Sequence, residues 1–592
     1  MQVLTRSEQK TMDTWDLGSL FENDAAWEAA VEELRSFIKE IPSYKGSLKA
    51  GRESLLKTMA FHAKVGILAE RVHSYAFLNW ASDTSNPANV ERSSIASTLM
   101  TELGAALAFF DPELLSIDEE VMNGYLADEA FEPYKVFLMR SMRYKAHVLS
   151  EREERIMALQ RESAQTPRNA FSDLTNIDFD FGRIGDKPLT QSTFSSFLMS
   201  EDRALRKKAY KQFYSRYNRN RHTLFRLYEG QVKQDIFRHT VRSYPSSREM
   251  SLFADDVPTG VYDRLIESVH AGLPVLHRYY ELRKKILGVR NLAHWDVYVP
   301  LVSGVKAHTP YEEAVKIIGE ALKPLGSEYV DTLTRGLTIE RWVDRYENKG
   351  KRSGAFSSGS YTGYPYILMN YKEDVLRDLF TLAHEGGHSM HSYYSARNNP
   401  FHHWDYSIFE AEVASTFNEQ LVANYMIEST DDVQTKRYII AKQLDDVVAT
   451  LFRQTMFAEF EHKIHKKAEA SIPLTLDLVR STYGDLLRQY FGPGVTFIDE
   501  SNLEGLRIPH FYSPFYVYKY ATGLSAAIAL SKEVLGGGEE ERARYLRFLS
   551  NGGRYFPIEN LKQAGVDMST GKPVDDAIAH FAQRLELFET LS

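Results

Sequence analysis

Apolar residues recur every three or four positions through most of this chain, the spacing that one buried face of an α-helix requires. The pattern predicts helices over 26–38, 55–81, 93–110 and 151–163, separated by polar residues or by turns rich in Pro and Gly. Long helices are expected again from Thr193 onward. Helices therefore dominate the predicted fold.

Two segments depart from this helical pattern. Residues 176–182 alternate between polar and apolar, which predicts a pair of strands ending near 187–188. Residues 361–371 are rich in β-prone side chains and have a single Pro near their start, which predicts an exposed edge strand. An edge strand can hydrogen-bond the backbone of an extended peptide, so Gly363 and Tyr364 are candidate substrate contacts.

The segment before this strand, residues 353–360, consists mostly of Gly and Ser and predicts a mobile loop that folds over a substrate. At 592 residues the chain is too long for one ordinary core. We expect a helical N-terminal lobe over 1–200 and a catalytic domain over 201–592.

Composition narrows the class of protein. A hydrophobic fraction of 43% and a charged fraction of 26% are those of a soluble globular protein. The absence of cysteine excludes disulfides and thiol catalysis, and it suits a reducing cytoplasm. A net charge of −9 without a basic stripe argues against a nucleic-acid partner. The N-terminal residues contain no apolar signal core and no 18-residue apolar run occurs, so we expect a cytoplasmic protein without a membrane partner.

One motif carries specific chemistry. His384 and His388 are four residues apart, and Glu385 directly follows the first histidine. On a helix this spacing places both imidazoles on one face, where they can bind a single ion. His-Glu-x-x-His is the pattern of zinc peptidases, in which the glutamate deprotonates a metal-bound water. Apolar residues around the motif predict a buried helix, and buried histidines need partners.

A catalytic zinc needs a third protein ligand. The metzincin pattern is excluded because His391 and Tyr394 stand where it requires Gly and His. Residues downstream predict a second helix that carries Glu410, Glu412 and Glu419. Glu410 and Glu412 point to different sides of a helix, whereas Glu412 and Glu419 share a face. We expect Glu412 to be the ligand and Glu419 to orient a histidine, although spacing alone does not choose among the three glutamates.

The runs His-Glu-Gly-Gly-His at 384–388 and Glu-Val-Ala-Ser-Thr at 412–416 resemble the oligoendopeptidase F branch of the thimet-oligopeptidase-like zinc peptidases. The resemblance extends over most of the chain and includes 14–21, 354–371 and 508–523. It implies that Glu412 is the third ligand of one Zn²⁺ per chain. Many members of the branch have a bulky residue at the position of Gly386, but this difference leaves the ligands in place.

The resemblance also implies a fold and a substrate. The implied fold is a mainly α zincin metallopeptidase of the gluzincin type, with two largely helical lobes around a deep channel and a small β-sheet near the zinc. The implied activity is hydrolysis of internal bonds in short, unfolded oligopeptides. Zinc would lower the pKa of its bound water, and Glu385 would accept the proton as general base.

The region 510–520 contains one histidine and four tyrosines, side chains that can stabilise an oxyanion. Relatives use a histidine and tyrosines from the matching region, which implies a catalytic role for His510. The tyrosine that contacts the oxyanion is not decided by the resemblance; Tyr518 is the first candidate and Tyr512 the second. Tyr516 and Tyr520 are then candidate substrate contacts.

A competing histidine pair, His462 and His465, lies three residues apart near the end of another predicted helix. Lysines follow it, as is common at a helix C-terminus, so we interpret the pair as structural.

Two other kinds of function remain open. The first is a peptide-binding protein that has lost activity, which the complete set of candidate catalytic residues disfavours. The second is a zinc carboxypeptidase or dipeptidyl carboxypeptidase on the same fold, which the motifs do not separate from an endopeptidase. The sequence does not give side-chain preference, substrate length or oligomeric state.

Overall fold

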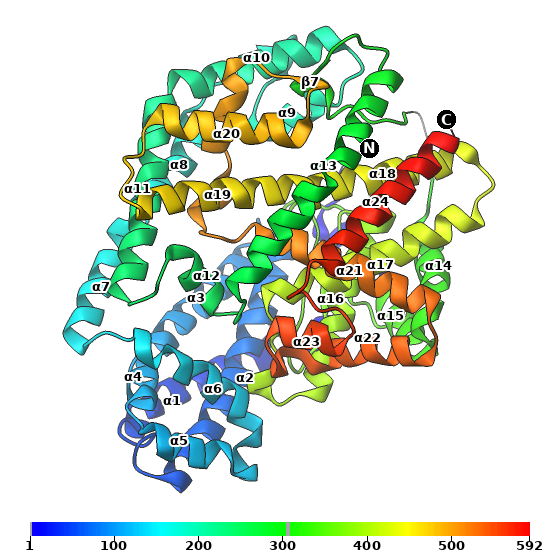
Figure 1. Cartoon of the computed structure of the whole chain (residues 1–592). Helices are drawn as coiled ribbons and strands as arrows, with labels where there is room; N and C mark the ends of the chain where they lie inside the picture. The colour runs from blue at the N-terminus through cyan, green and yellow to red at the C-terminus, as the bar shows by residue number, and fades with distance from the viewer. Residues whose placement is uncertain (1–2, 304–307, 592) are drawn as a thin grey trace. The chain divides into compact units, whose positions relative to one another are not determined.

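The computed structural model describes residues 3–303 and 308–591 and confirms a mainly α-helical protein (Figure 1). Two compact units can be distinguished, each assembled from three stretches of chain. Unit 1 comprises 1–146, 306–428 and 527–566, and unit 2 comprises 147–305, 429–526 and 567–592. The expected domains 1–200 and 201–592 remain a prediction, because the compact units follow spatial contacts rather than sequence order.

Helices make up most of unit 1. Those described are α1 (Asp24–Glu40), α2 (Arg52–Ser82), α3 (Pro87–Ala106), α4 (Phe110–Leu115), α5 (Glu119–Leu126), α6 (Lys135–Arg143), α14 (Tyr311–Ala321), α15 (Ser327–Leu337), α16 (Leu376–Asn398), α17 (Ile408–Ser429), α22 (Glu539–Asn551) and α23 (Pro557–Gln563).

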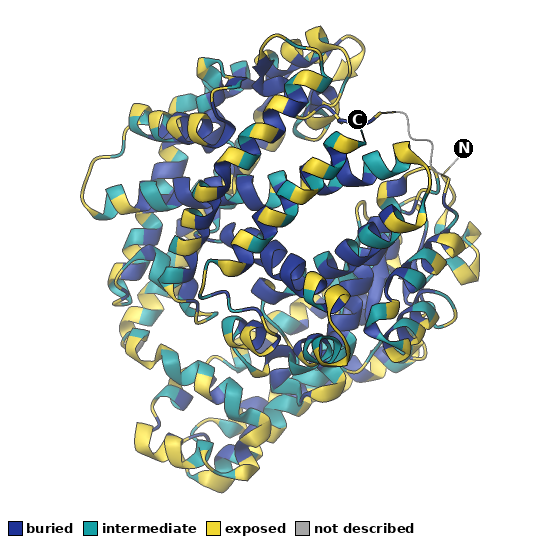
Figure 2. Ribbon diagram, turned by 45° about the vertical axis from the view of Figure 1, so that its right-hand side comes forward, coloured by how far each residue is buried: buried dark blue, intermediate teal, exposed yellow. Residues whose placement is uncertain are grey.

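The first helix shows how the sequence pattern produces this structure. The side chain of Asn23 caps α1 by accepting a hydrogen bond from the backbone N–H of Ala26. Trp27, Val31 and Leu34 then fall on one face and are buried against α2 and α3. Figure 2 shows the same division along the longer helices, with buried residues on one side and exposed residues on the other. The helices predicted over 26–38 and 55–81 are confirmed as α1 and α2.

A three-stranded sheet lies in unit 1. It is formed by β4 (Val343–Asp344), β5 (Phe356–Ser358) and β6 (Tyr366–Leu368) in the order β4-β6-β5. The β4–β6 pair is parallel and the β5–β6 pair is antiparallel, with Ser357 opposite Ile367. The prediction that 361–371 forms an edge strand is therefore wrong. β6 is central and all three of its residues are buried, whereas β5, from the predicted mobile loop, forms an edge.

Unit 2 is also built largely from helices. Those described are α7 (Glu151–Ala164), α8 (Thr166–Asp173), α9 (Gln191–Leu198), α10 (Arg203–Arg219), α11 (Arg221–Val241), α12 (Ser247–Phe253), α13 (Thr259–Ile286), α18 (Val433–Val447), α19 (Arg453–Glu469), α20 (Leu476–Phe491) and α24 (Lys572–Thr590), while α21 (Tyr518–Gly536) contributes to both units.

Its strands are short. β1 (Arg183–Ile184) pairs with β2 (Lys187–Pro188), and β3 (Leu292–Ala293) pairs with β7 (Val495–Thr496). The strand pair predicted from 176–182 is thus displaced to the following residues. Phe179 and Phe181 are both buried and contact the ring of Tyr217, at centroid distances of 5.2 and 6.0 Å. Ile177, by contrast, is 76% exposed and lies in the π-helical turn Leu174–Asp178. The alternation over 176–182 therefore corresponds to the end of a helical turn followed by two buried phenylalanines, and not to strand pairing.

Among the described residues, one helical stretch, Pro87–Leu115, has the length and apolar composition of a helix that could cross a membrane. Of its most apolar 18 residues 17% are buried, and a single stretch of this kind is weak evidence for a membrane segment.

Candidate functional site

The His-Glu-x-x-His motif lies in the middle of α16, as its spacing predicted. The rings of His384 and His388 are one helical turn apart, with centroids separated by 4.9 Å and planes at 82°. Leu379, Leu382 and Ala383 anchor the helix because all three are buried. Both imidazoles are thereby presented from one face of a fixed helix.

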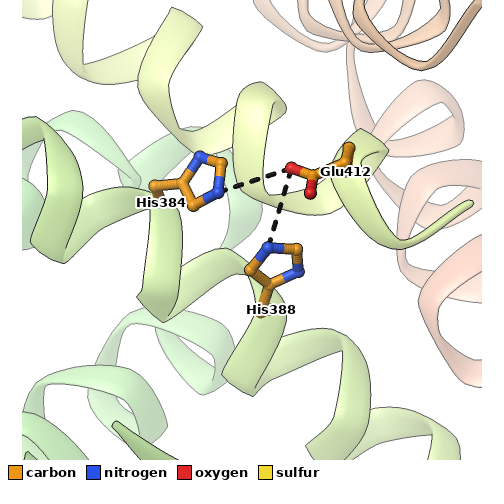
Figure 3. Close-up of side chains that lie close together, drawn as sticks. All are labelled: His384, His388 and Glu412. Carbon is orange, nitrogen blue, oxygen red and sulfur yellow. Dashed lines mark ion pairs between the residues drawn. The ribbon is translucent and has the colours of Figure 1, made fainter. Parts of the chain in front are cut away.

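Helix α17 brings a carboxylate to these two rings. Oε2 of Glu412 lies 3.4 Å from Nε2 of His384 and 3.7 Å from Nε2 of His388 (Figure 3). One donor atom from each of the three residues lies within 4.8 Å of the other two. Three convergent donors of this kind can hold a metal ion, and no other group of this type was found among the described residues.

Glycine allows the two helices to approach this closely. A Cβ atom added at Gly387 would lie 2.4 Å from the carbonyl oxygen of Ala414 and 2.6 Å from Cα of Ser415. A side chain there would push α17 away from α16. Gly386 faces a different neighbour, because its Cβ would meet only the side chain of Leu333, at 3.3 Å.

Glu419 contacts His384 from the side opposite Glu412. Its Oε1 lies 2.8 Å from Nδ1 of His384, which leaves Nε2 of that ring directed at Glu412. Burial lowers the pKa of His384, but the hydrogen bond and charge of Glu419 outweigh it and raise the pKa to about 9. This is the arrangement expected for a carboxylate that orients a metal-binding histidine.

Glu410 is turned away from the histidines. Its carboxylate accepts hydrogen bonds from Nδ2 of Asn560 (2.6 Å) and from Oγ of Ser407 (3.0 Å). The side chain is fully buried, and burial raises its pKa to about 7. The geometry therefore favours Glu412 over Glu410 as the carboxylate of the site.

The three convergent donors face a cavity of about 560 Å³. Glu385 is part of its wall and is only 6% exposed. Burial raises the pKa of Glu385 to about 7, although a backbone hydrogen bond from Ser357 acts in the opposite direction. The cavity is lined by Ala355, Phe356, Ser357, Gly359, His384, Glu385, His388, Ser392, Trp404, Asp405, Tyr406, Ile408, Ala411 and Glu412.

Two parts of this wall were not identified from the sequence. The first is β5, which supplies Phe356 and Ser357. The Gly- and Ser-rich composition of 353–360 predicts a mobile loop over these residues, not a strand. The second is Tyr406, and no motif or periodicity in the sequence indicates that this residue belongs to the wall. Its hydroxyl lies 2.9 Å from Oγ of Ser392, and its ring stacks on the buried ring of His391 at 3.6 Å.

The proposed substrate contacts Gly363 and Tyr364 are not among the described residues that line this cavity. A Cβ at Gly363 would lie 2.5 Å from Cδ2 of Leu20, and the backbone N–H of Tyr364 donates to Oγ of Ser19 at 3.0 Å. Both residues pack toward the N-terminal segment, so their role as substrate contacts stays a prediction.

The other predicted catalytic residues belong to unit 2. The hydroxyl of Tyr520 lies 3.4 Å from Nε2 of His510, and the ring of Tyr516 contacts both residues. These three side chains are half-buried. Tyr512 and Tyr518 are 6% and 1% exposed, and burial raises the pKa of both hydroxyls. Tyr520 and Tyr516 are therefore the accessible tyrosines of this segment.

The competing pair on α19 has a different role. Its neighbour Glu461 is buried and accepts a hydrogen bond of 2.8 Å from the backbone N–H of Phe515. Phe515 has a φ of 52°, a left-handed conformation that a non-glycine residue rarely adopts. His465 packs on the Phe515 ring at 4.8 Å and pairs with Asp235 at 3.2 Å. These contacts fit the structural interpretation and show that α19 supports the His510–Tyr520 segment.

The sequence models of two known families match this chain. The sequence model of Peptidase family M3 matches residues 196–580, and that of Oligopeptidase F matches 113–181. This chain belongs to peptidase family M3. The resemblance to oligoendopeptidase F and the predicted enzyme class, a metalloendopeptidase, are confirmed.

This M3 peptidase is similar to curated and solved proteins over its whole length. It is 41% identical to an oligoendopeptidase F homolog of Borreliella burgdorferi, with 99% of each chain covered. A solved chain from Chlamydophila abortus has 36% identity and a TM-score of 0.93, with both chains fully covered. The oligoendopeptidase-F of Enterococcus faecium has 34% identity and a TM-score of 0.73, covering 96% of this chain and 99% of that one. These structures and the family confirm the predicted zincin-type fold.

Proposed function

We propose that this M3 peptidase hydrolyses internal bonds of short, unfolded oligopeptides, using one Zn²⁺ held by His384, His388 and Glu412. The observation that carries the proposal is the convergence of three donor atoms within 4.8 Å, next to Glu385, in the wall of a cavity. The relatives named oligoendopeptidase F support the substrate class.

The donor set fits zinc. Two imidazoles and one carboxylate are a ligand set of catalytic zinc sites. The contact of Glu419 with Nδ1 of His384 leaves Nε2 as the nitrogen that would bind the ion, with loss of its proton. When bound, zinc would lower the pKa of a water molecule and polarise the substrate carbonyl.

Glu385 then supplies the acid–base chemistry. Its carboxylate lines the same cavity as both histidines and carries no ion pair with a described residue. We assign to it the removal of a proton from the attacking water and the transfer of that proton to the departing amine. A nearby dication would favour the ionised form of Glu385, because opposite charges lower a carboxyl pKa.

The substrate backbone is assigned to β5. This strand is at the edge of the sheet and borders the cavity through Phe356 and Ser357. An extended peptide that pairs with β5 would be held by main-chain hydrogen bonds, so side-chain selectivity would be broad.

His510 and Tyr520 are assigned to the developing oxyanion as hydrogen-bond donors. Tyr520 is preferred here because its hydroxyl contacts His510 and its side chain is half-buried. A role for Tyr518 or Tyr512 would require their buried hydroxyls to become accessible. A cytoplasmic location also belongs to this proposal, and the cysteine-free sequence supports it.

The test is mass spectrometry of a mixture of short peptides and one folded protein after incubation with the enzyme, with and without a zinc chelator. Internal cuts confined to the short peptides and abolished by the chelator would agree with the proposal. Stepwise shortening from the carboxyl end would indicate the carboxypeptidase alternative. No cleavage by zinc-loaded enzyme would indicate the peptide-binding alternative.

A further inference from the structure

Unit 2 contains a second cavity, of about 700 Å³, and the side chains that line it carry a net positive charge. Four arginines and a single glutamate line it, whereas the chain has a net charge of −9. Its volume lies within the range of roughly 300–1,000 Å³ that small-ligand sites occupy. None of its lining residues is shared with the cavity at the metal site.

The arginines come from two walls. Arg161 on α7 and Arg168 on α8 are seven residues apart, and the two helices are separated by a single residue. Arg238 and Arg242, at the end of α11, are four residues apart, which places them on the same side of that helix. The guanidinium groups therefore enter one space from two directions.

Most of this positive charge forms no ion pair within the part of the chain that the structure describes. Arg242 is neutralised by Glu154, which accepts two hydrogen bonds of 2.9 Å from its guanidinium group. For Arg161, Arg168 and Arg238 the structure shows no ion pair with a described residue. Three cationic groups thus remain available to an anion that enters the cavity.

The remaining lining suits a peptide better than a bare ion. Gln165 and Asn169 offer amide groups that can hydrogen-bond a peptide backbone, and Met157 and Met250 offer adaptable apolar surface. Tyr512 also lines the cavity, with a buried hydroxyl that has no hydrogen-bond partner among the described residues.

Tyr512 connects this cavity to the proposed catalytic machinery. It is the last residue of the short 3-10 helix Pro509–Tyr512, which also carries His510. A ligand in the cavity would therefore contact the segment that is assigned to the oxyanion.

We propose that this arginine-lined cavity binds a carboxylate of the peptide substrate. The forked guanidinium matches the two oxygens of a carboxylate, and Arg161, Arg168 and Arg238 are the groups that would supply it. The proposal rests on the proposed peptidase function, and it adds a preference for acidic peptides or for a free carboxyl terminus. Inorganic phosphate has similar recognition chemistry, and the test must separate the two.

The experiment measures peptide binding to the full-length Glu385→Gln variant by fluorescence anisotropy, so that cleavage does not interfere. Three forms of one labelled peptide are compared: the free acid, the carboxyl-terminal amide, and the amide with a glutamate near its end. Each is titrated into Glu385→Gln alone and into the same protein carrying Arg238→Gln or Arg161→Gln. Arg155→Gln is the matched control, because Arg155 is an exposed arginine of α7 outside the cavity lining.

We expect the free acid to bind at least about tenfold more tightly than the amide, and Arg238→Gln to remove this difference. Arg155→Gln should preserve it, and Arg238→Lys should restore part of it. If the added glutamate rescues binding of the amide, the carboxylate comes from a side chain; without rescue, it comes from the terminus.

The proposal is overturned if acid and amide bind equally, or if the cavity variants weaken both to the same extent. It is also overturned if inorganic phosphate binds and the peptide carboxylate does not compete with it. Because binding is measured directly, these outcomes do not depend on cleavage. An enzyme that binds acidic peptides but cuts none would refute the proposed function alone.

Discussion

The backbone N–H of Phe515 donates a hydrogen bond of 2.8 Å to Oε1 of the buried Glu461, and Phe515 is held in a left-handed conformation. A strained backbone persists only where its surroundings fix it, and here the residue lies between His510 and Tyr520. Glu461 thereby positions, from a buried site, the segment that presents these two side chains.

This contact predicts a pH dependence of stability. Burial raises the pKa of Glu461 from 4.5 to about 8, so the folded state binds its proton more tightly than the unfolded state. The contribution of this proton to the free energy of unfolding is complete below pH about 4.5. It falls as pH rises toward 8, by up to about 1.4 kcal/mol per pH unit.

The measurement is thermal unfolding of the wild type and Glu461→Gln between pH 5 and 8, since the amide keeps the acceptor oxygen and does not titrate. The difference in Tm between the two proteins should change steadily with pH in favour of the variant. Parallel Tm curves would show that Glu461 does not titrate in this range.

Glu412→Ala should lose metal. It removes one of three donors that converge within 4.8 Å, and two histidines alone hold zinc weakly. Glu419→Gln should weaken metal affinity less, by about 10- to 100-fold, because it removes the partner of His384 and not a donor. Glu410→Gln is the matched control and should keep its metal. Zinc content after dialysis measures all three, and full retention by Glu412→Ala would exclude Glu412 as a ligand.

Glu385→Gln should keep zinc and lose turnover by about 10²-fold or more, because the amide cannot accept a proton and the donor set is intact. The check is kcat on a cleaved peptide together with zinc content. Normal kcat would remove Glu385 from the role of general base.

The two glycines of the motif should respond differently to the same substitution. Gly387→Ala places a Cβ 2.4 Å from the backbone oxygen of Ala414, so α16 and α17 must separate. We expect destabilisation of about 1–3 kcal/mol and weaker zinc binding. Gly386→Ala meets only the Leu333 side chain, and the gain of about 1 kcal/mol in helix propensity can offset that contact. Thermal unfolding and zinc content distinguish the two, and equal effects would contradict this account.

His510→Ala should lower kcat, by about 10²-fold, more than it raises KM, because the proposed bond forms mainly in the transition state. Tyr520→Phe should act in the same direction. His222→Ala, at an exposed histidine of the same unit, serves as the control. A rise in KM with unchanged kcat would instead assign His510 to ground-state binding.

The parts of this site that could be predicted from sequence are the local ones. Four-residue spacing on one helix fixes the relation of His384 to His388, and helical periodicity fixed the bounds of α1 and α2 within a few residues. The choice of Glu412 as the metal ligand needed the family resemblance. Helical periodicity places Glu410 on a different side of the helix from Glu412, but it places Glu419 on the same face as Glu412.

Features that depend on distant residues were missed. β5 and β6 are both short, and which of them lies at the edge depends on the pairing of β6 with β4. The closeness of Gly387 to Ala414 depends on the packing of two helices. Likewise, nothing near Tyr406 in the sequence shows that its ring stacks on His391.

The interleaving of the two units has a consequence for the newly synthesised enzyme. The helices that carry His384 and Glu412 belong to a unit whose last stretch is 527–566, and Asn560 and Phe548 in that stretch contact Glu410 and His391. A ribosome must therefore translate almost the whole chain before unit 1 can complete its fold. Proteolytic activity would then begin only when synthesis is nearly finished, and prematurely terminated fragments would be inactive.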